Sequence, residues 1–244
     1  MKKLITMYLL FLPIVAFGAG GNIHLEDANV DLGDKPSLQR GAKLFVNYCL
    51  SCHSASYARF NGVAKDLGIP EDVMLKNMVF VSDKIGSYME IGMDKEDAKK
   101  WLGVAPPDLS VIARSRGADW IYTFLNSFYL DSKKATGVNN TVFKDTAMPH
   151  VLWELQGWQR PVYTEEHHDE KTTKVISGFE LASAGKMNEE DYQTATRDLT
   201  NFLAYLGEPA QLIRKKVGFW VILFLLVFLV PAYKLKKEYW KDVK

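Results

Sequence analysis

Cysteine is scarce in this sequence, and so is net charge. The 244 residues include two cysteines, and 30 basic against 29 acidic side chains give a formal charge of +1. Two cysteines cannot build a disulfide-dense scaffold, and a general nucleic-acid binder would normally be strongly basic. The sequence also shows no internal repeat, low-complexity segment, phosphate-binding loop, proteolytic triad or paired-carboxylate site. Its 48% hydrophobic residues predict one ordinary folded domain with attachments, or two small domains.

The first 20 residues have the pattern of a secretory signal peptide. Lys2 and Lys3 precede an apolar run over residues 4–17, and small residues follow up to Gly20. We therefore expect export, with cleavage near residues 18–20. The alternative is an uncleaved membrane helix, for which the apolar run is short.

A second apolar segment predicts a membrane anchor over residues 212–233. Residues 217–233 form a run of 17 positions without a charge, and with Leu212 and Ile213 the helix can cross a hydrocarbon core ~30 Å thick. Trp220 and Tyr233 lie near its ends, where aromatic rings prefer the membrane interface. The alternative is a buried helix of a soluble domain, for which so long an uncharged run is unusual.

The basic tail predicts the orientation of this anchor. Residues 234–244 hold five lysines against two acidic residues, and positive flanks remain cytoplasmic. Residues 21–211 would then form a periplasmic domain on a bacterial inner (cytoplasmic) membrane. This domain has 20 basic and 27 acidic residues, a formal charge of −7. Its acidic groups at 165–170 and 189–191 either attract a basic partner or form a solvated surface.

Both cysteines lie in one pentapeptide, Cys49-Leu-Ser-Cys52-His53. C-x-x-C-H is the attachment signature of c-type haem, because two thiols at this spacing reach the two vinyl groups of one porphyrin and the adjacent histidine ligates the iron. A thioredoxin-like dithiol would need a βαβ context, and a zinc site would need two more ligands close by. The motif therefore predicts one covalent haem c held by Cys49, Cys52 and His53.

The sequence identifies the sixth iron ligand less clearly than it identifies Cys49, Cys52 and His53. A thioether ligand raises the reduction potential and suits electron transfer, and Met148 is the best candidate because Pro149 stiffens the backbone beside it. A methionine taken singly packs more often than it ligates. The other candidates therefore stay open: Met74, Met78, Met89, Met93, Met187, His24, His150, His167 and His168.

Hydrophobic periodicity predicts helices on both sides of the motif. Residues 37–49 carry a helical stripe that delivers the motif at its end. A second stripe over residues 188–207 begins with a good N-cap. We expect this helix to pack on the first, as last helices do in similar cytochromes. Asp119 is expected to cap a third helix over residues 120–130. Residues 157–185 have no clear periodicity and are expected to form a loop.

Several segments of the sequence resemble the cytochrome c1 family. They are Ser-Leu-Gln-Arg-Gly-Ala (37–42), Phe45 to His53, Ala-Pro-Pro-Asp-Leu-Ser (105–110) and Ala-Met-Pro (147–149), followed by the C-terminal anchor. The similarity runs from about residue 32 to the tail. It implies a mainly α, cytochrome c-like haem domain with long loop insertions, plus one C-terminal transmembrane helix.

The resemblance also implies a role for single residues. The cysteines at 49 and 52 would form thioethers, and His53 and Met148 would ligate the iron. Arg116, with Arg114 as its nearby competitor, would pair with a haem propionate.

Two further positions depart from the family's usual residues. Trp120 lies where many members have a tyrosine beside the propionates. His150 replaces a commoner proline-rich continuation, and we expect it at the rim of the haem pocket rather than on the iron.

The resemblance implies an electron-transfer subunit. Cytochrome c1 belongs to the dimeric cytochrome bc1 complex, the ubiquinol–cytochrome c reductase, and passes single electrons from a Rieske iron–sulfur protein to cytochrome c. Partners implied are therefore cytochrome b, the Rieske protein, cytochrome c and membrane lipid, with no nucleic acid and no quinol site in this chain. A free-standing membrane-tethered electron carrier is the alternative, and a haem enzyme or gas sensor with an open iron site is a third reading.

Overall fold

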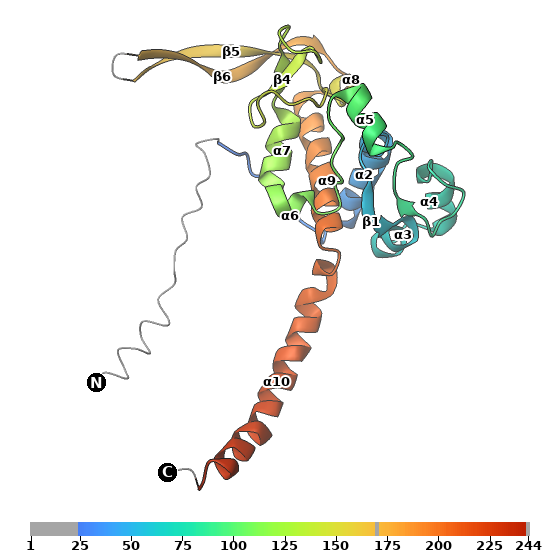
Figure 1. Cartoon of the computed structure of the whole chain (residues 1–244), viewed down its shortest axis with the longest axis vertical. Helices are drawn as coiled ribbons and strands as arrows, with labels where there is room; N and C mark the ends of the chain where they lie inside the picture. The colour runs from blue at the N-terminus through green and yellow to red at the C-terminus, as the bar shows by residue number, and fades with distance from the viewer. Residues whose placement is uncertain (1–23, 169–170, 243–244) are drawn as a thin grey trace.

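The helices of the domain gather at one end of a single long helix (Figure 1). The structure is a computed structural model that describes residues 24–168 and 171–242, so the predicted signal peptide lies outside the described residues. Its elements are, in chain order, α2 (Lys35–Leu44), the π-helical turn η1 (Phe45–Cys49), β1 (Ala55–Arg59), α3 (Phe60–Leu67), α4 (Glu71–Met78), β2 (Tyr88–Met89), α5 (Lys95–Leu102), α6 (Ile112–Arg116), α7 (Ala118–Asn126), β3 (Phe128–Leu130), β4 (Val138–Asn140), α8 (Trp153–Gln156), β5 (Gly157–His168), β6 (Lys171–Ala184), α9 (Glu189–Gly207) and α10 (Gln211–Tyr239). Among the described residues the strands form only two-stranded sheets, β1–β2, β3–β4 and β5–β6. The predicted mainly α fold class is confirmed.

Two helices from opposite ends of the domain, α2 and α9, cross in close contact. A Cβ atom on Gly41 would lie only 2.0 Å from the backbone oxygen of Asp198, so glycine is required where the two backbones meet. The rings of Phe45 and Phe202 pack beside this contact with centroids 5.5 Å apart. Arg40 forms a bidentate ion pair with the buried carboxylate of Asp198. The predicted packing of the last domain helix on the first is confirmed.

Side-chain caps fix where these two helices begin. The Asp34 carboxylate accepts a hydrogen bond from the Ser37 N–H at 3.0 Å, and the Asn188 side chain accepts one from the Asp191 N–H at 2.8 Å. Such caps satisfy N–H groups that have no partner within the helix. α2 continues into the wider turn η1, which ends at Cys49. The cysteine motif therefore starts at the end of a capped and buried helix.

The N-terminal segment, residues 24–34, lies across α7 and α9. Three of its backbone N–H groups donate to side chains of these helices: Glu26 to Thr123, Ala28 to Asp119 and Asp31 to Asn201. The prediction that Asp119 caps a helix over residues 120–130 is wrong. α7 already begins at Ala118 and ends at Asn126, and the residues beyond it form β3. The Asp119 carboxylate binds the N-terminal segment instead of capping the helix.

The segment over residues 157–185 is a long β-hairpin and not the expected loop. Its strands β5 and β6 pair from Gly157 with Ala184 to His168 with Lys171, with two register shifts. The hairpin extends away from the helices (Figure 1), and Tyr163 and Leu181 on it are exposed. Without one buried face the strands need no alternation of apolar and polar residues, so the periodicity carried no strand signal.

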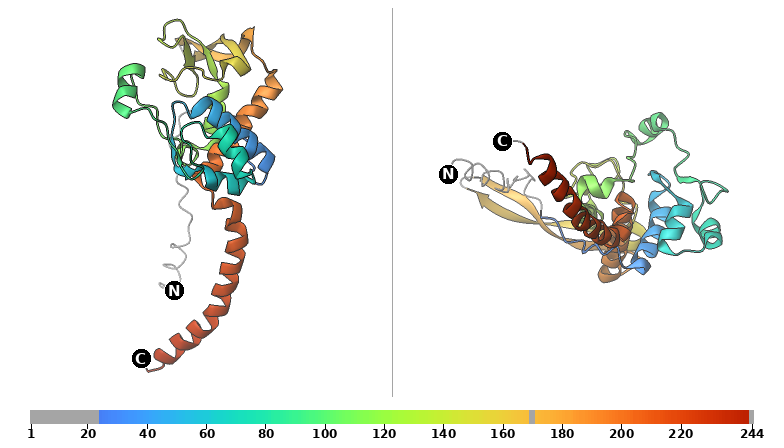
Figure 2. Two further views of the ribbon diagram at one scale, coloured as in Figure 1. Left: turned by 90° about the vertical axis from the view of Figure 1, so that its right-hand side faces the viewer. Right: turned by 90° about the horizontal axis from the view of Figure 1, so that it is seen from below.

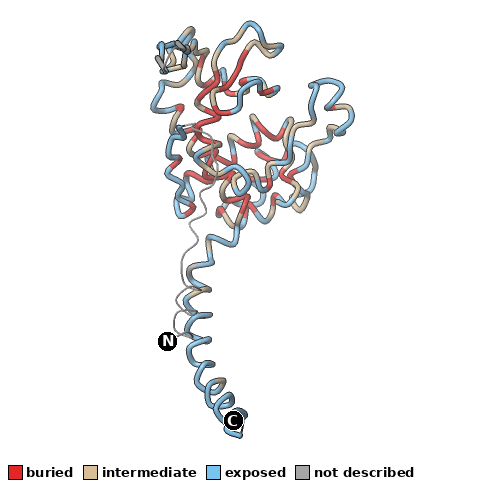
Figure 3. The backbone as a smooth tube through the Cα atoms, turned by 60° about the vertical axis from the view of Figure 1, so that its left-hand side comes forward, coloured by how far each residue is buried: buried red, intermediate tan, exposed pale blue. Residues whose placement is uncertain are grey.

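The C-terminal helix α10 leaves the domain as one curved rod (Figure 2). Its part from Lys216 to Tyr239 is long and apolar enough to cross a membrane, with a mean hydropathy of 2.1 and nothing of that stretch buried. Figure 3 shows this helix exposed over most of its length, in contrast to the domain. The predicted anchor over residues 212–233 lies wholly within α10, and the helix also takes in the first part of the basic tail.

Candidate functional site

The two cysteines lie in a tight turn at the end of η1. The backbone N–H groups of Cys52 and His53 both donate to the carbonyl of Cys49, at 3.0 and 2.8 Å. Both thiols are unbridged. Cys49 is buried, and burial raises the pKa of its thiol to about 12. A redox dithiol reacts through an accessible thiol of low pKa, and the Cys49 thiol is neither accessible nor of low pKa.

The His53 ring is oriented by a backbone carbonyl. Its Nδ1 lies 2.8 Å from the carbonyl oxygen of Pro107, and since a carbonyl only accepts, Nδ1 carries the proton in this bond. Burial lowers the pKa of His53 despite that hydrogen bond, which favours the neutral ring. Nε2 is then the nitrogen with a free lone pair. A metal-ligating histidine usually has this arrangement, because the second nitrogen donates to a carbonyl or carboxylate.

The segment 105–110 forms a bracket along the residues that follow His53. Leu109 N–H donates to the Ser54 carbonyl at 2.8 Å. The Asp108 carboxylate accepts from the backbone and the hydroxyl of Ser56, at 3.0 and 2.7 Å, and from the Ser110 N–H at 2.7 Å. These bonds fix the carbonyl of Pro107 against His53. The sequence singled out this segment only by resemblance, because a role played by a backbone carbonyl leaves no trace in residue type.

Met148 lies in the loop between β4 and α8. Its side chain is half-buried and packs against the hydrophobic core that includes Cys49. The Met148 N–H donates to the hydroxyl of Thr146 at 3.3 Å, and Pro149 has no N–H to donate. The thioether is therefore presented from a backbone whose neighbours on both sides are restricted.

His150 is a core residue, so the expectation that it lies at a pocket rim is wrong. Its side chain is 4% exposed. The ring stacks on Phe128 with centroids 5.0 Å apart and meets the edge of Trp158 at 5.9 Å. The aromatic partners on two sides explain the burial of His150. The sequence around Met148 could not show this burial, because the partners come from other elements.

The two predicted propionate residues lie together beside the Met148 loop. The Arg116 guanidinium lies 5.2 Å from the ring centre of Trp120 and 5.9 Å from that of Phe143, which belongs to this loop. The Trp120 and Phe143 rings contact each other at 6.2 Å. The side chain of Arg114 instead lies close to Gly207 at the end of α9. Arg116 and Arg114 thus have different neighbours although only one residue separates them.

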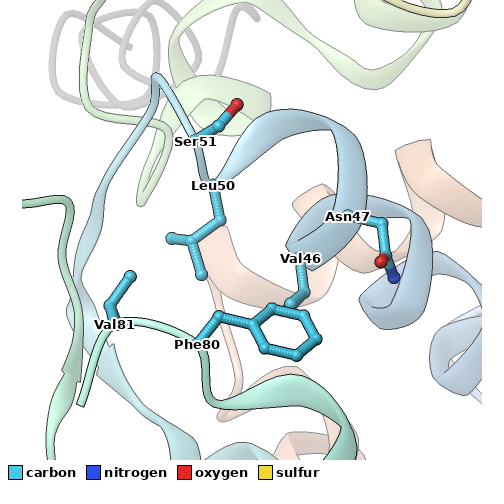
Figure 4. Close-up of a pocket in the computed structure, with 6 residues that line it drawn as sticks. All are labelled: Val46, Asn47, Leu50, Ser51, Phe80 and Val81. Atoms are coloured by element: carbon cyan, nitrogen blue, oxygen red, sulfur yellow. The ribbon is translucent and has the colours of Figure 1, made fainter.

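A hollow of about 260 Å³ adjoins the cysteine motif (Figure 4). It is lined by Val46, Asn47, Leu50, Ser51, Phe80 and Val81. None of these six is a histidine, cysteine or methionine, so the hollow borders the motif without holding a soft ligand for iron.

The residues present fit a covalently attached haem. Two unbridged thiols stand three positions apart, a neutral imidazole next to them keeps Nε2 free, and a half-buried thioether packs against the same core. An arginine and an indole lie beside the thioether loop. Fold and site together define the class of c-type cytochromes that carry a C-terminal helix long enough to cross a membrane.

Comparison with known proteins identifies the family within this class. The profile described as "Cytochrome C1 family" matches residues 27–243. The chain belongs to the cytochrome c1 family, haem-containing electron-transfer subunits of bc1 complexes, and it carries one covalently bound haem c. The resemblance noted in the sequence is therefore confirmed.

Several relatives match over most or all of the chain. Cytochrome c1 of Allochromatium vinosum is 49% identical over 244 residues, which cover 100% of both proteins. The ammonia monooxygenase gamma subunit of Nitrosomonas europaea is 45% identical over 243 residues, covering 100% of this chain and 99% of the relative. Cytochrome c1 of Blastochloris viridis is 24% identical, over 86% of this chain and 82% of the relative.

Proposed function

We propose that this chain passes single electrons from a Rieske iron–sulfur protein to a cytochrome c, as the c-type subunit of a ubiquinol–cytochrome c reductase. The observation that carries the proposal is the 2.8 Å bond between His53 Nδ1 and the Pro107 carbonyl beside two unbridged cysteines. This bond fixes the proton on Nδ1 while burial keeps the ring neutral, so Nε2 is free for a metal. When bound, haem supplies a one-electron couple between ferrous and ferric iron.

Four side chains would hold this group. Cys49 and Cys52 would form the thioethers, and His53 and Met148 would ligate the iron. A thioether ligand would favour reduced iron and raise the potential. With His53 and Met148 both bound, no iron position would be left for a small substrate, and the chain would move electrons only.

Arg116 and Trp120 would bind the propionates. Their position beside the Met148 loop supports this assignment, since Arg116 touches both Trp120 and Phe143 of that loop. A planar guanidinium suits bidentate contact with a carboxylate. We place Arg116 before Arg114 because the Arg114 side chain lies against Gly207 of α9.

We further propose a periplasmic domain on a bacterial inner membrane. Residues 1–20 would be the cleaved signal peptide, residues 21–211 the exported haem domain, residues 212–233 the transmembrane anchor and residues 234–244 the cytoplasmic tail. The exposed apolar helix α10 supports the anchor, and the excess of lysine after residue 233 supports the orientation.

The partners proposed are cytochrome b and the Rieske protein within a dimeric complex, cytochrome c as the acceptor, and membrane lipid. Membership of the cytochrome c1 family supports the first two. The −7 charge of residues 21–211 would steer a basic acceptor, with association slowing as salt rises. One relative is named as an ammonia monooxygenase gamma subunit, so assembly with a monooxygenase is the second candidate for this chain.

Purification of the tagged full chain from membranes in mild detergent tests the assembly. A reduced-minus-oxidised spectrum showing b-type haem together with c-type haem, and turnover of quinol with cytochrome c, would support the reductase. Elution of c-type haem alone in several mild detergents would instead favour the free-standing tethered carrier. Co-elution of a monooxygenase, identified by mass spectrometry, would place the chain in the other assembly.

A further inference from the structure

Two buried asparagines stand where β4 ends and the Met148 loop begins. Asn139 is 3% exposed and Asn140 is 0% exposed. A buried amide is costly unless its donors and acceptors find partners. Both amides are bonded, and mostly to the loop that follows.

The Asn140 amide joins this loop to α7. Its Nδ2 donates to the Phe124 carbonyl at 2.8 Å. Its Oδ1 accepts from the N–H groups of Val142 and Phe143, at 2.9 and 3.1 Å, and from the Ser127 hydroxyl at 3.2 Å. The Asn140 side chain thus fixes the backbone of the first part of the loop and ties it to α7.

The Asn139 amide holds the second part of the loop. Its Oδ1 accepts from the Asp145 N–H at 2.8 Å, and its Nδ2 donates to the carboxylates of Asp131 at 3.1 Å and Asp145 at 3.5 Å. Asp145 has a φ of +64°, in the left-handed region that residues with a Cβ seldom adopt. Asn139 therefore secures an unfavourable turn only three residues before Met148.

We propose that Asn139 and Asn140 are positioning residues for the haem iron, which fold residues 141–147 so that the Met148 thioether is presented at a fixed place. This inference rests on the proposed role of Met148 as axial ligand. The two amides act on the two parts of the site beside this loop, the aromatic group around Arg116 and the Met148 thioether. Asn140 binds the backbone of Phe143, whose ring contacts Trp120 and Arg116, and Asn139 sets the turn that leads to the thioether.

The test uses the full chain matured with haem in the variants Asn139→Ala and Asn140→Ala. A loop without its amide bonds presents the thioether less often, so exogenous ligands compete better for ferric iron. We expect imidazole to bind at least about tenfold more tightly, equivalent to ~1.4 kcal/mol. The methionine–iron charge-transfer band should weaken and the reduction potential should fall.

Asn201 offers a matched control on the other side of the domain. It is 3% exposed, its Nδ2 donates to the Ser37 hydroxyl at 2.7 Å, and its Oδ1 accepts from the Asp31 N–H at 3.1 Å. Asn201→Ala should lower the melting temperature much as the two other variants do, yet leave the band, the potential and imidazole affinity unchanged. Asp145→Gly in the Asn139→Ala background should restore part of the band, since glycine adopts a positive φ without a penalty.

Met148→Leu separates failure of the inference from failure of the ligand assignment. If Met148→Leu removes the band and both asparagine variants behave like Asn201→Ala, the positioning role is wrong and the ligand stands. If Met148→Leu leaves the spectrum intact, the ligand assignment is wrong and the inference falls with it. Should Asn140→Ala yield no holoprotein, Asn139→Ala and its Asp145→Gly rescue decide the question.

Discussion

The two sides of the proposed haem site are built by different means. The side with the cysteines, residues 49–53, follows a capped helix and makes its turn with its own backbone bonds to Cys49. The side with Met148 is a loop between the three-residue strand β4 and the one-turn helix α8, held by the amides of Asn139 and Asn140. The first side is a continuation of secondary structure, and the second is fixed by side chains that bind backbone.

This difference decides how each side responds to substitution. A helix end and a local turn depend on bonds within a few residues, so the cysteine side should tolerate changes elsewhere. A loop held by three or four side-chain bonds loses its shape when one of them is removed, because a buried group left without a partner costs ~1–3 kcal/mol. The cysteine side should therefore determine whether haem is attached, and the Met148 side how the iron behaves.

Removal of both thiols should have the largest effect. The variant Cys49→Ala with Cys52→Ala cannot form thioethers, so we expect complete loss of haem that resists extraction with acidic acetone. The measurement is the c-type haem spectrum before and after extraction, with the total chain quantified by immunoblot. Asn47→Ala, an exposed change on the same helical turn, is the control and should retain full attachment. Covalent haem in the double variant would contradict the assignment.

Met148→Ala should spare attachment and change the iron. Haem should remain covalent, the methionine–iron charge-transfer band should vanish, and imidazole or cyanide should bind. The potential should fall by on the order of 0.1 V or more, a fraction of the roughly 0.8 V range that axial ligands span. Redox titration and ligand binding check this, with Met93→Ala, a half-buried residue outside the hydrophobic core, as a comparison for methionine loss in general. A spectrum and potential equal to those of the wild type would show that another residue is the ligand.

The contrast also explains which parts were predictable from the sequence. The cysteine motif and the cap at Asn188 rest on local pattern, and they were predicted. The α2–α9 packing was predicted from similarity to other cytochromes, and the cap of Asp34 on α2 was not predicted. The bracket formed by Pro107 and Asp108 was not, because a carbonyl acts there through the backbone. The asparagine bonds to the Met148 loop follow no periodicity and depend on residues distant in sequence, such as Phe124.

The β5–β6 hairpin is a second feature that could not be predicted from the sequence. Strand patterns are visible when one face is buried and the other is wet, and the described side chains of this hairpin are largely exposed or only half-buried. Periodicity therefore carried no information about its strands. The misplacement of His150 has a related cause, because its burial between Phe128 and Trp158 arises from tertiary packing.

Asp108→Asn should weaken the bracket that holds Pro107 against His53. Partial burial raises the pKa of Asp108, but the hydrogen bonds from Ser110 and Ser56 lower it by more, so the net pKa lies below the ordinary value. We expect a loss of about 1 kcal/mol in the free energy of unfolding at pH 7, the low side for bonds to a charged group because the carboxylate is solvent-exposed.

The pH dependence of that loss gives the stricter test. A carboxylate with a depressed folded-state pKa contributes its full stabilisation above the unfolded pKa of about 3.9. The contribution disappears as pH falls through the lower folded-state pKa. Thermal unfolding between pH 7 and pH 3 should show the wild type and Asp108→Asn converging at the acid end. The exposed Asp83→Asn serves as the control, and a difference that does not shrink with acid would contradict the role of the charge.

The smallest effect is expected for His150→Phe. The His150 ring stacks on Phe128, and its buried Nε2 has no hydrogen-bond partner among the described residues. Phenylalanine keeps a flat ring in this place and removes the unpaired polar atom, so the free energy of unfolding should stay within about 1 kcal/mol of the wild type or rise. His150→Ala, which deletes the ring, should cost about 2 kcal/mol or more by leaving a cavity. Because neither change touches the amides of Asn139 and Asn140, the charge-transfer band should persist in His150→Phe. Loss of the band would mean that His150 acts on the thioether through a polar bond. The Met148 loop would then be held by His150 as well as by Asn139 and Asn140.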